Sequence, residues 1–97
     1  MNEQILLVMK YLNDNESVTQ KELSDNYITA AEAAYEADAE TDANADAVAV
    51  AADYAYADAC ADATYAHTKS KVDRYFDITG ENKQDYINEI AKNKGEE

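Results

Sequence analysis

The sequence predicts an all-α protein, because helix-forming residues dominate it and helix breakers are scarce. Between Ala30 and Ala66, 18 of 37 residues are alanine, and the whole chain of 97 residues contains two glycines and no proline. Alanine is the best helix former, whereas glycine and proline are the worst. We therefore expect one long alanine-rich acidic helix packed with short N- and C-terminal helices, all within a single domain over 1–97.

The N-terminal helices are predicted from apolar spacing and from a capping motif. A stripe of apolar residues at helical spacing predicts a helix over 3–13. Thr19, followed three residues later by Glu22, forms a capping box that starts a short helix over 19–25. The polar run 24–26 should end that helix. The apolar stripe consists of Ile5, Met9 and Leu12, widened by Leu6 and Val8.

The long helix is predicted over 30–77. Thr29 and Glu32 repeat the capping box just before it, and Ile28 is placed to contact Ala33 as a hydrophobic staple. No glycine or proline interrupts the segment. At a rise of about 1.5 Å per residue, a continuous helix of this length would span about 70 Å.

Weaker helix formers predict where this long helix kinks or breaks. They cluster at 41–44 and at 67–70, so a kink or break is expected at each. The clearest stop is Gly80, because glycine readily ends a helix in the left-handed conformation. A last amphipathic helix is predicted over 81–93.

The long segment also carries a seam of mostly alanine side chains on one helical face. Small side chains let two helices approach near the low end of the usual separation of about 8–10 Å. A chain of 97 residues with few large apolar side chains has little else to bury, so we expect this seam to mediate self-association as a homodimer. The residues expected in this alanine seam are Ala45, Val48, Ala52, Ala55, Ala59 and Ala63.

Acidic residues dominate the charge of the chain. Its 21 Asp and Glu outnumber 8 Lys and Arg, which gives a net charge of −13, and nine acids but no base lie within 30–66. Such a field repels nucleic acid and anionic membranes and attracts basic protein surfaces. We therefore expect no direct nucleic-acid binding, no membrane association, and a protein partner with a basic surface. The expected partner-binding residues are Glu32, Glu36, Glu40, Asp42, Asp46, Asp53, Asp58 and Asp62.

Cysteine content and hydropathy predict a cytoplasmic protein. Cys60 is the single cysteine, which excludes an intramolecular disulfide and fits a reducing compartment. The apolar run 5–9 is too short for the core of a signal peptide and follows an acidic residue in place of basic ones. No apolar run is long enough to span a membrane.

The sequence contains no pattern typical of an enzyme or of a cofactor site. It has no Gly-x-Ser-x-Gly and no glycine-rich phosphate loop, so we expect neither catalysis nor a bound cofactor. One metal motif comes close, because Asp42, Asn44, Asp46 and Asp53 match four ligand positions of a calcium loop. That motif has Ala47 where the loop requires glycine, which makes a calcium-binding helical module the least favoured alternative.

Alanine alternates with tyrosine and acidic residues over 33–35, 52–58 and 63–66, and the segment from Val72 to Gly80 closes this pattern. The pattern resembles small acidic Ala/Tyr-rich proteins of tailed bacteriophages, with OrbA-type BREX inhibitors among the candidates. It implies a non-enzymatic protein that acts in the bacterial cytosol, where it binds and inhibits a host defence component of the restriction or BREX type.

The main alternative to that function is a DNA mimic. Nine carboxylates along a helix of about 55 Å give one charge per about 6 Å, against one per about 1.7 Å of duplex axis. Even two paired helices fall short of the charge density of DNA. Inhibition through a specific protein contact is therefore the favoured interpretation.

Overall fold

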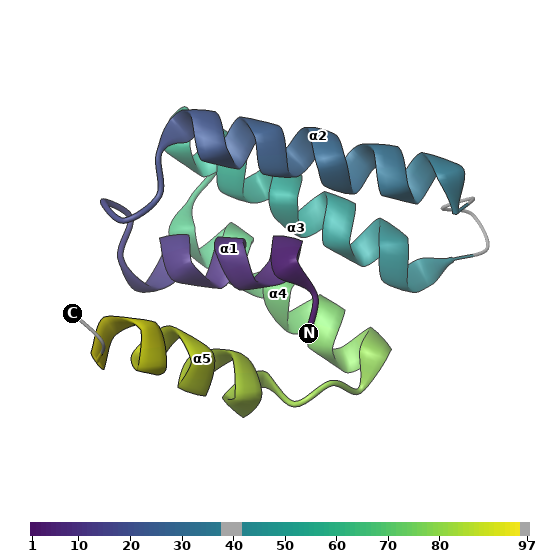
Figure 1. Cartoon of the computed structure of the whole chain (residues 1–97). Coiled ribbons are helices and arrows are strands. Elements are labelled where there is room, and N and C mark those ends of the chain that lie inside the picture. Colours follow the sequence, from purple (N-terminus) through teal and green to yellow (C-terminus); the bar gives the residue numbers. More distant parts are fainter. Residues whose placement is uncertain (38–41, 96–97) are drawn as a thin grey trace.

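The computed structural model describes residues 1–37 and 42–95, with side chains described as far as Lys92. Within these residues the chain is all-α and contains no strand, which confirms the predicted fold class. Figure 1 shows α2 and α3 side by side, with α1 next to them and α5 on the other side of α1. The helices are α1 (Glu3–Asn13), α2 (Gln20–Glu36), α3 (Ala43–Ala59), α4 (Tyr65–Thr79) and α5 (Lys83–Gly95).

The predicted single long helix over 30–77 is wrong. This segment contributes to three helices, α2, α3 and α4, and α3 packs most extensively against the other two. The longest dimension of the whole molecule is 40 Å, whereas a helix over 30–77 would need about 70 Å. The chain therefore folds back on itself and buries its alanine-rich helix inside one molecule.

Helix α2 is longer than the predicted helix over 19–25. Its capping box is present as predicted: the Thr19 side chain accepts from the Glu22 amide, and the Glu22 carboxylate accepts from the Thr19 amide. The polar run 24–26 does not end the helix, because the side-chain amide of Asn26 is buried and donates to the backbone carbonyl of Gln4 in α1 at 3.2 Å. Asparagine usually favours turns, but this hydrogen bond to another helix holds Asn26 inside α2.

The second predicted capping box is also wrong. Thr29 and Glu32 both lie inside α2, so neither starts a helix. Ile28, the expected staple residue, is instead half exposed on the outside of α2. Helix α3 does begin within the predicted break 41–44: the Asp42 side chain accepts from the amide of Ala45 at 3.1 Å and caps the first turn.

The second break lies at 60–64 and not at 67–70. Helix α3 ends in a Schellman motif, in which the amide of Asp62 donates to the Ala57 carbonyl at 2.8 Å and the amide of Ala61 donates to the Asp58 carbonyl at 3.0 Å. Ala61 has a φ of 65°, the left-handed conformation that glycine usually supplies at this position. Because position 61 is an alanine, no glycine or asparagine there predicted this helix end.

The predicted break 67–70 lies inside α4 for two reasons. Thr64 starts the helix as its N-cap and accepts from the amide of His67 at 3.2 Å. Thr68 is fully buried, and its hydroxyl donates to the carbonyls of Thr64 at 3.1 Å and Tyr54 at 3.3 Å. A weak helix former is thereby held in the helix. The predicted stop at Gly80 is confirmed, since Gly80 caps α4 with a φ of 72°.

The Schellman motif leads to a stability prediction. Ala61→Gly should stabilise the fold by about 0.5–1 kcal/mol, because glycine adopts the left-handed conformation without the steric cost that alanine bears. Ala57→Gly, inside α3, should destabilise it by a similar amount. Urea denaturation followed by circular dichroism measures both changes, and an Ala61→Gly variant as unstable as Ala57→Gly would contradict the motif.

The alanine seam packs inside the molecule. Ala52 and Ala55 are fully buried and Val48 is 7 % exposed, all within one core that includes residues of every helix. Ala59 is partly buried against the same core, and Ala45 is half-buried. Ala63 lies outside the helices in the connection between α3 and α4.

Side chains buried in this way have no surface to offer a second chain. The expected role of the alanine seam in self-association is therefore corrected: its small side chains let α2 and α4 of the same molecule approach α3 closely. A homodimer stays a prediction, and it would need a different interface.

Candidate functional site

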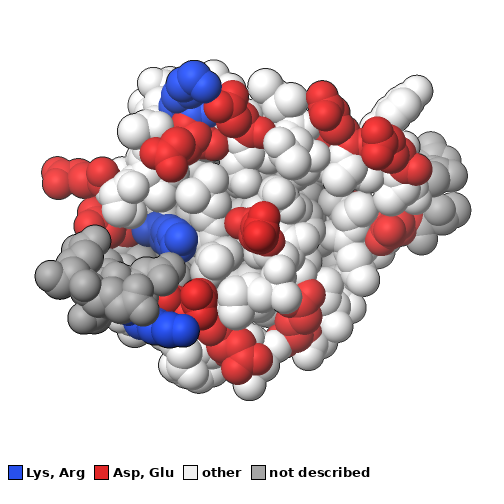
Figure 2. Space-filling model, in the orientation of Figure 1, with Lys and Arg blue, Asp and Glu red and all other residues white. Residues whose placement is uncertain are grey.

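Acidic side chains are spread over the molecular surface and do not form a single strip. Figure 2 shows them scattered over the visible face, with few basic side chains among them. This distribution follows from the broken long helix, because acids expected on one continuous face are divided among α2, α3 and the α3–α4 connection. The field of the protein is therefore negative over most of this face.

The predicted partner-binding acids fall into two groups. Those in the first group are exposed and make no ion pair within the described part of the chain. Glu40 lies outside the described residues. The exposed acids are Glu32 and Glu36 on α2, Asp53 on α3 and Asp62 in the α3–α4 connection.

The second group stabilises the fold. Asp42 caps α3, and Asp46 pairs with Arg74 of α4 at 3.4 Å between carboxylate oxygen and guanidinium nitrogen. Asp58 is half-buried beside Tyr11, whose pKa is raised by burial and further by the Asp58 carboxylate. These three carboxylates have partners within the molecule, so they are less available to a second protein.

The outer face of α2 combines exposed apolar side chains with acids. Tyr35 is 88 % exposed and Ile28 is 50 % exposed. They are seven residues apart and so lie two turns apart on the same side of the helix, with Glu32 between them and Glu36 after them. We call these four residues the α2 face.

The α2 face points outward because the opposite side of the helix packs into the core. Ala30 and Ala34, one turn apart, are 2 % and 6 % exposed, and α2 packs most extensively on α3. Tyr35 follows Ala34 by one position and is therefore rotated about 100° away from the interior. Ile28 was missed as a surface residue because its apolar character and its place before Thr29 suggested a staple.

No basic side chain lies near the α2 face in sequence. From Glu22 to Thr68 the chain contains neither lysine nor arginine. Lys21 on α2 pairs with Asp25 at 2.8 Å, and Arg74 pairs with Asp46. Glu32 and Glu36 thus have no basic residue close to them in sequence and make no ion pair among the described residues.

The calcium alternative does not fit this geometry. Eleven of the twelve positions of the motif, from Ala43 to Asp53, lie in the regular helix α3, where Ala47 is fully buried. A calcium loop instead requires an irregular backbone that turns sharply at its sixth position. Among residues 1–37 and 42–95, no cluster of three histidine, cysteine or acidic side chains is placed to hold a metal ion.

A separate polar cluster links the N-terminal segment to α4 and to the first turn of α5. The hydroxyls of Tyr75 and Tyr86 each donate to one oxygen of the Glu81 carboxylate at 2.5 Å. The Tyr86 hydroxyl also accepts from the backbone amide of Asn2 at 2.8 Å. The two tyrosine side chains are 2 % and 1 % exposed, and the Tyr86 ring packs edge-to-face on Phe76 with centroids 5.0 Å apart.

Burial and hydrogen bonding shift the pKa values of all three side chains of this cluster. Burial raises the pKa of Tyr75 and Tyr86, and their hydrogen bonds to Glu81 raise it further. Burial alone would raise the pKa of Glu81, but the two tyrosine hydroxyls lower it on balance. At neutral pH the cluster therefore consists of two neutral phenols hydrogen-bonded to one ionised carboxylate.

Comparisons with protein-family models, curated proteins and solved structures found no match to this chain. Over the part of the chain that the structure describes, no helix combines the length and apolar character needed to cross a membrane.

Proposed function

We propose that this protein is a non-enzymatic interaction protein that docks its α2 face onto a basic surface of another protein. The observation that carries the proposal is the 88 % exposure of Tyr35 beside two carboxylates that make no ion pair among the described residues. Tyrosine is enriched among the residues that dominate binding energy in protein interfaces. Charges next to such an anchor accelerate encounter with an oppositely charged partner.

The partner class follows from charge and from the phage resemblance. A net charge of −13 favours a partner with a basic surface. The resemblance to small acidic phage proteins makes a host defence component of the restriction or BREX type the first candidate. In this proposal the protein acts in the bacterial cytosol and inhibits its partner by covering that basic surface.

The test first captures the partner from a bacterial lysate on the wild-type protein. It then compares the binding of that partner to two variants of the α2 face. Tyr35→Ala should raise the Kd at least about 30-fold, mainly through faster dissociation, because loss of an interface anchor costs about 2 kcal/mol. Glu32→Gln combined with Glu36→Gln should lower the association rate constant about tenfold at low salt and change dissociation little. Surface plasmon resonance measures both rate constants.

Tyr65→Ala is the matched control for this test. Tyr65 is 54 % exposed but lies on α4, outside the α2 face. Binding should be unchanged in this variant. If Tyr35→Ala binds the partner as wild type does, or if Tyr65→Ala loses as much affinity, the proposed docking face is wrong.

The DNA-mimic alternative gives a different result in the same assay. A mimic should compete with duplex DNA for the partner and lose affinity steeply as salt increases, since many charges contribute together. Docking through an aromatic anchor should show a shallower salt dependence. The involvement of Asp42, Asp46 and Asp58 in the fold leaves fewer free charges for mimicry, and for that reason docking through the α2 face is preferred.

A further inference from the structure

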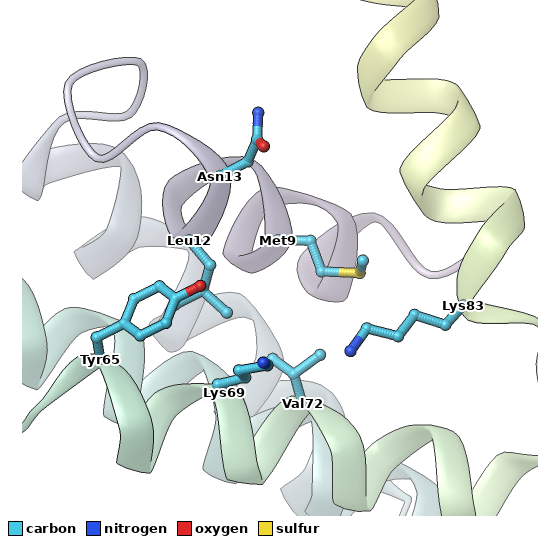
Figure 3. A pocket seen from close by; sticks show the side chains of 7 residues that line it. All are labelled: Met9, Leu12, Asn13, Tyr65, Lys69, Val72 and Lys83. Atoms are coloured by element: carbon cyan, nitrogen blue, oxygen red, sulfur yellow. The ribbon is translucent and has the colours of Figure 1, made fainter.

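Two adjoining pockets lie where α1 meets α4 and α5. The first has a volume of about 160 Å³, and its apolar lining comes from Met9, Leu12 and Val72 (Figure 3). The second has a volume of about 260 Å³ and is lined by Met9 together with Ile87 and Ile90 of α5. Because Met9 lines both, the two pockets form one apolar groove, which we call the α1–α5 groove.

The mouth of the α1–α5 groove is cationic. Figure 3 shows the Lys83 side chain extending from α5 toward α4, where the Lys69 ammonium lies beside Val72. The Lys83 ammonium also contacts the Asp73 carboxylate at 2.8 Å, whereas Lys69 has no ion pair within the described residues. The entrance therefore carries Lys69, which has no ion pair among the described residues, and Lys83, which pairs with Asp73.

This local charge is opposite to that of the rest of the molecule. Four of the eight basic residues of the chain fall between positions 69 and 83, although the net charge is −13. The first pocket is lined by two of these bases and by no acidic side chain. A small anion is therefore attracted to this point of a surface that otherwise repels it.

We propose that the α1–α5 groove binds a small anionic amphiphile, specifically a monocarboxylate with a short apolar chain. The carboxylate would contact the ammonium groups of Lys69 and Lys83, and the chain would lie along Met9 toward Ile87 and Ile90. Each pocket alone is smaller than the range of about 300–1,000 Å³ typical of drug-sized ligands, and the two together lie near its lower end, which favours a small ligand that extends through both. Apolar lining with a few placed polar groups is the usual composition of such sites.

Methyl NMR titration with octanoate tests this site directly, with octan-1-ol as the neutral ligand of equal chain length. Octanoate should give saturable shifts at Met9, Val72 and Ile87, and it should bind at least fivefold more tightly than octan-1-ol. Lys69→Gln should weaken octanoate binding at least fivefold and leave octan-1-ol binding unchanged, because only the carboxylate depends on the ammonium group.

Lys71→Gln is the matched control, since the Lys71 ammonium lies over the Tyr54 ring at 5.0 Å and does not line the groove. This variant should bind octanoate as wild type does. Equal affinities for octanoate and octan-1-ol, equal losses in the two lysine variants, or shifts that never saturate would each overturn the site. The α2 face shares no residue with the groove, so this test stands apart from that of the proposed function.

Discussion

Ala52→Glu should destabilise the fold by more than about 3 kcal/mol. Ala52 is fully buried on α3, the helix that packs between α2 and α4. A glutamate there both overfills a closely packed contact and buries a carboxylate without a partner, and each effect costs on the order of 1–3 kcal/mol or more. Because small domains are stable by only about 5–15 kcal/mol, urea denaturation should show a large loss of stability or an unfolded chain.

Ala66→Glu is the matched control for this substitution. Ala66 is exposed in the first turn of α4, where a carboxylate also faces the positive end of the helix dipole. Its stability should therefore stay within about 0.5 kcal/mol of wild type. If Ala52→Glu instead remained folded and merely separated a dimer into monomers in light scattering, the alanine seam would be an interface between chains after all.

The sequence predicts part of the role of the alanine seam and not the rest. Its spacing correctly indicated a helix face that approaches another helix closely. The same spacing suits a contact within one chain or between two chains. It therefore could not identify which helix packs against the seam. The answer depends on where the chain turns, and at Ala61 it turns with a residue that carries no turn signal.

Local signals predicted other parts of the fold correctly. The helix over 3–13, the capping box of Thr19 and Glu22, and the stop at Gly80 all depend on residues a few positions apart. The failures depend on distant partners. Asn26 stays helical through its bond to Gln4, 22 residues away, and that contact exists only in the folded chain.

The same distinction applies to the candidate site. Exposure of Glu32 and Glu36 followed from their place on a helix, whereas Asp46 was assigned to partner binding although it pairs with Arg74, 28 residues away. The cationic mouth of the α1–α5 groove could not be predicted at all. Its two lysines come from α4 and α5, and the groove that they border also needs α1, an arrangement that no sequence pattern revealed.

Glu81→Ala should destabilise the fold by about 2 kcal/mol at neutral pH. The substitution leaves the buried hydroxyls of Tyr75 and Tyr86 without their acceptor, and a hydrogen bond to a charged group contributes about 1.5–3 kcal/mol. Glu81 itself is exposed, so water replaces part of what is lost. Asp77→Ala, at an exposed position near the end of α4, is the control and should cause no loss.

The contribution of Glu81 should depend on pH. Its pKa is lower in the folded protein than the ordinary value of 4.5, so its stabilisation is complete above that value and is lost as the pH falls through the folded pKa. Burial is the largest cause of the raised pKa values of Tyr75 and Tyr86 and acts in wild type and in Glu81→Ala alike, so ionisation of the two phenols at high pH should lower the stability of both proteins. The difference in unfolding free energy between wild type and Glu81→Ala should therefore be greatest above about pH 5 and shrink as the pH falls further. Urea denaturation at pH 3 and pH 7 measures it, and an equal difference at both pH values would show that the ionised carboxylate does not hold the two phenols.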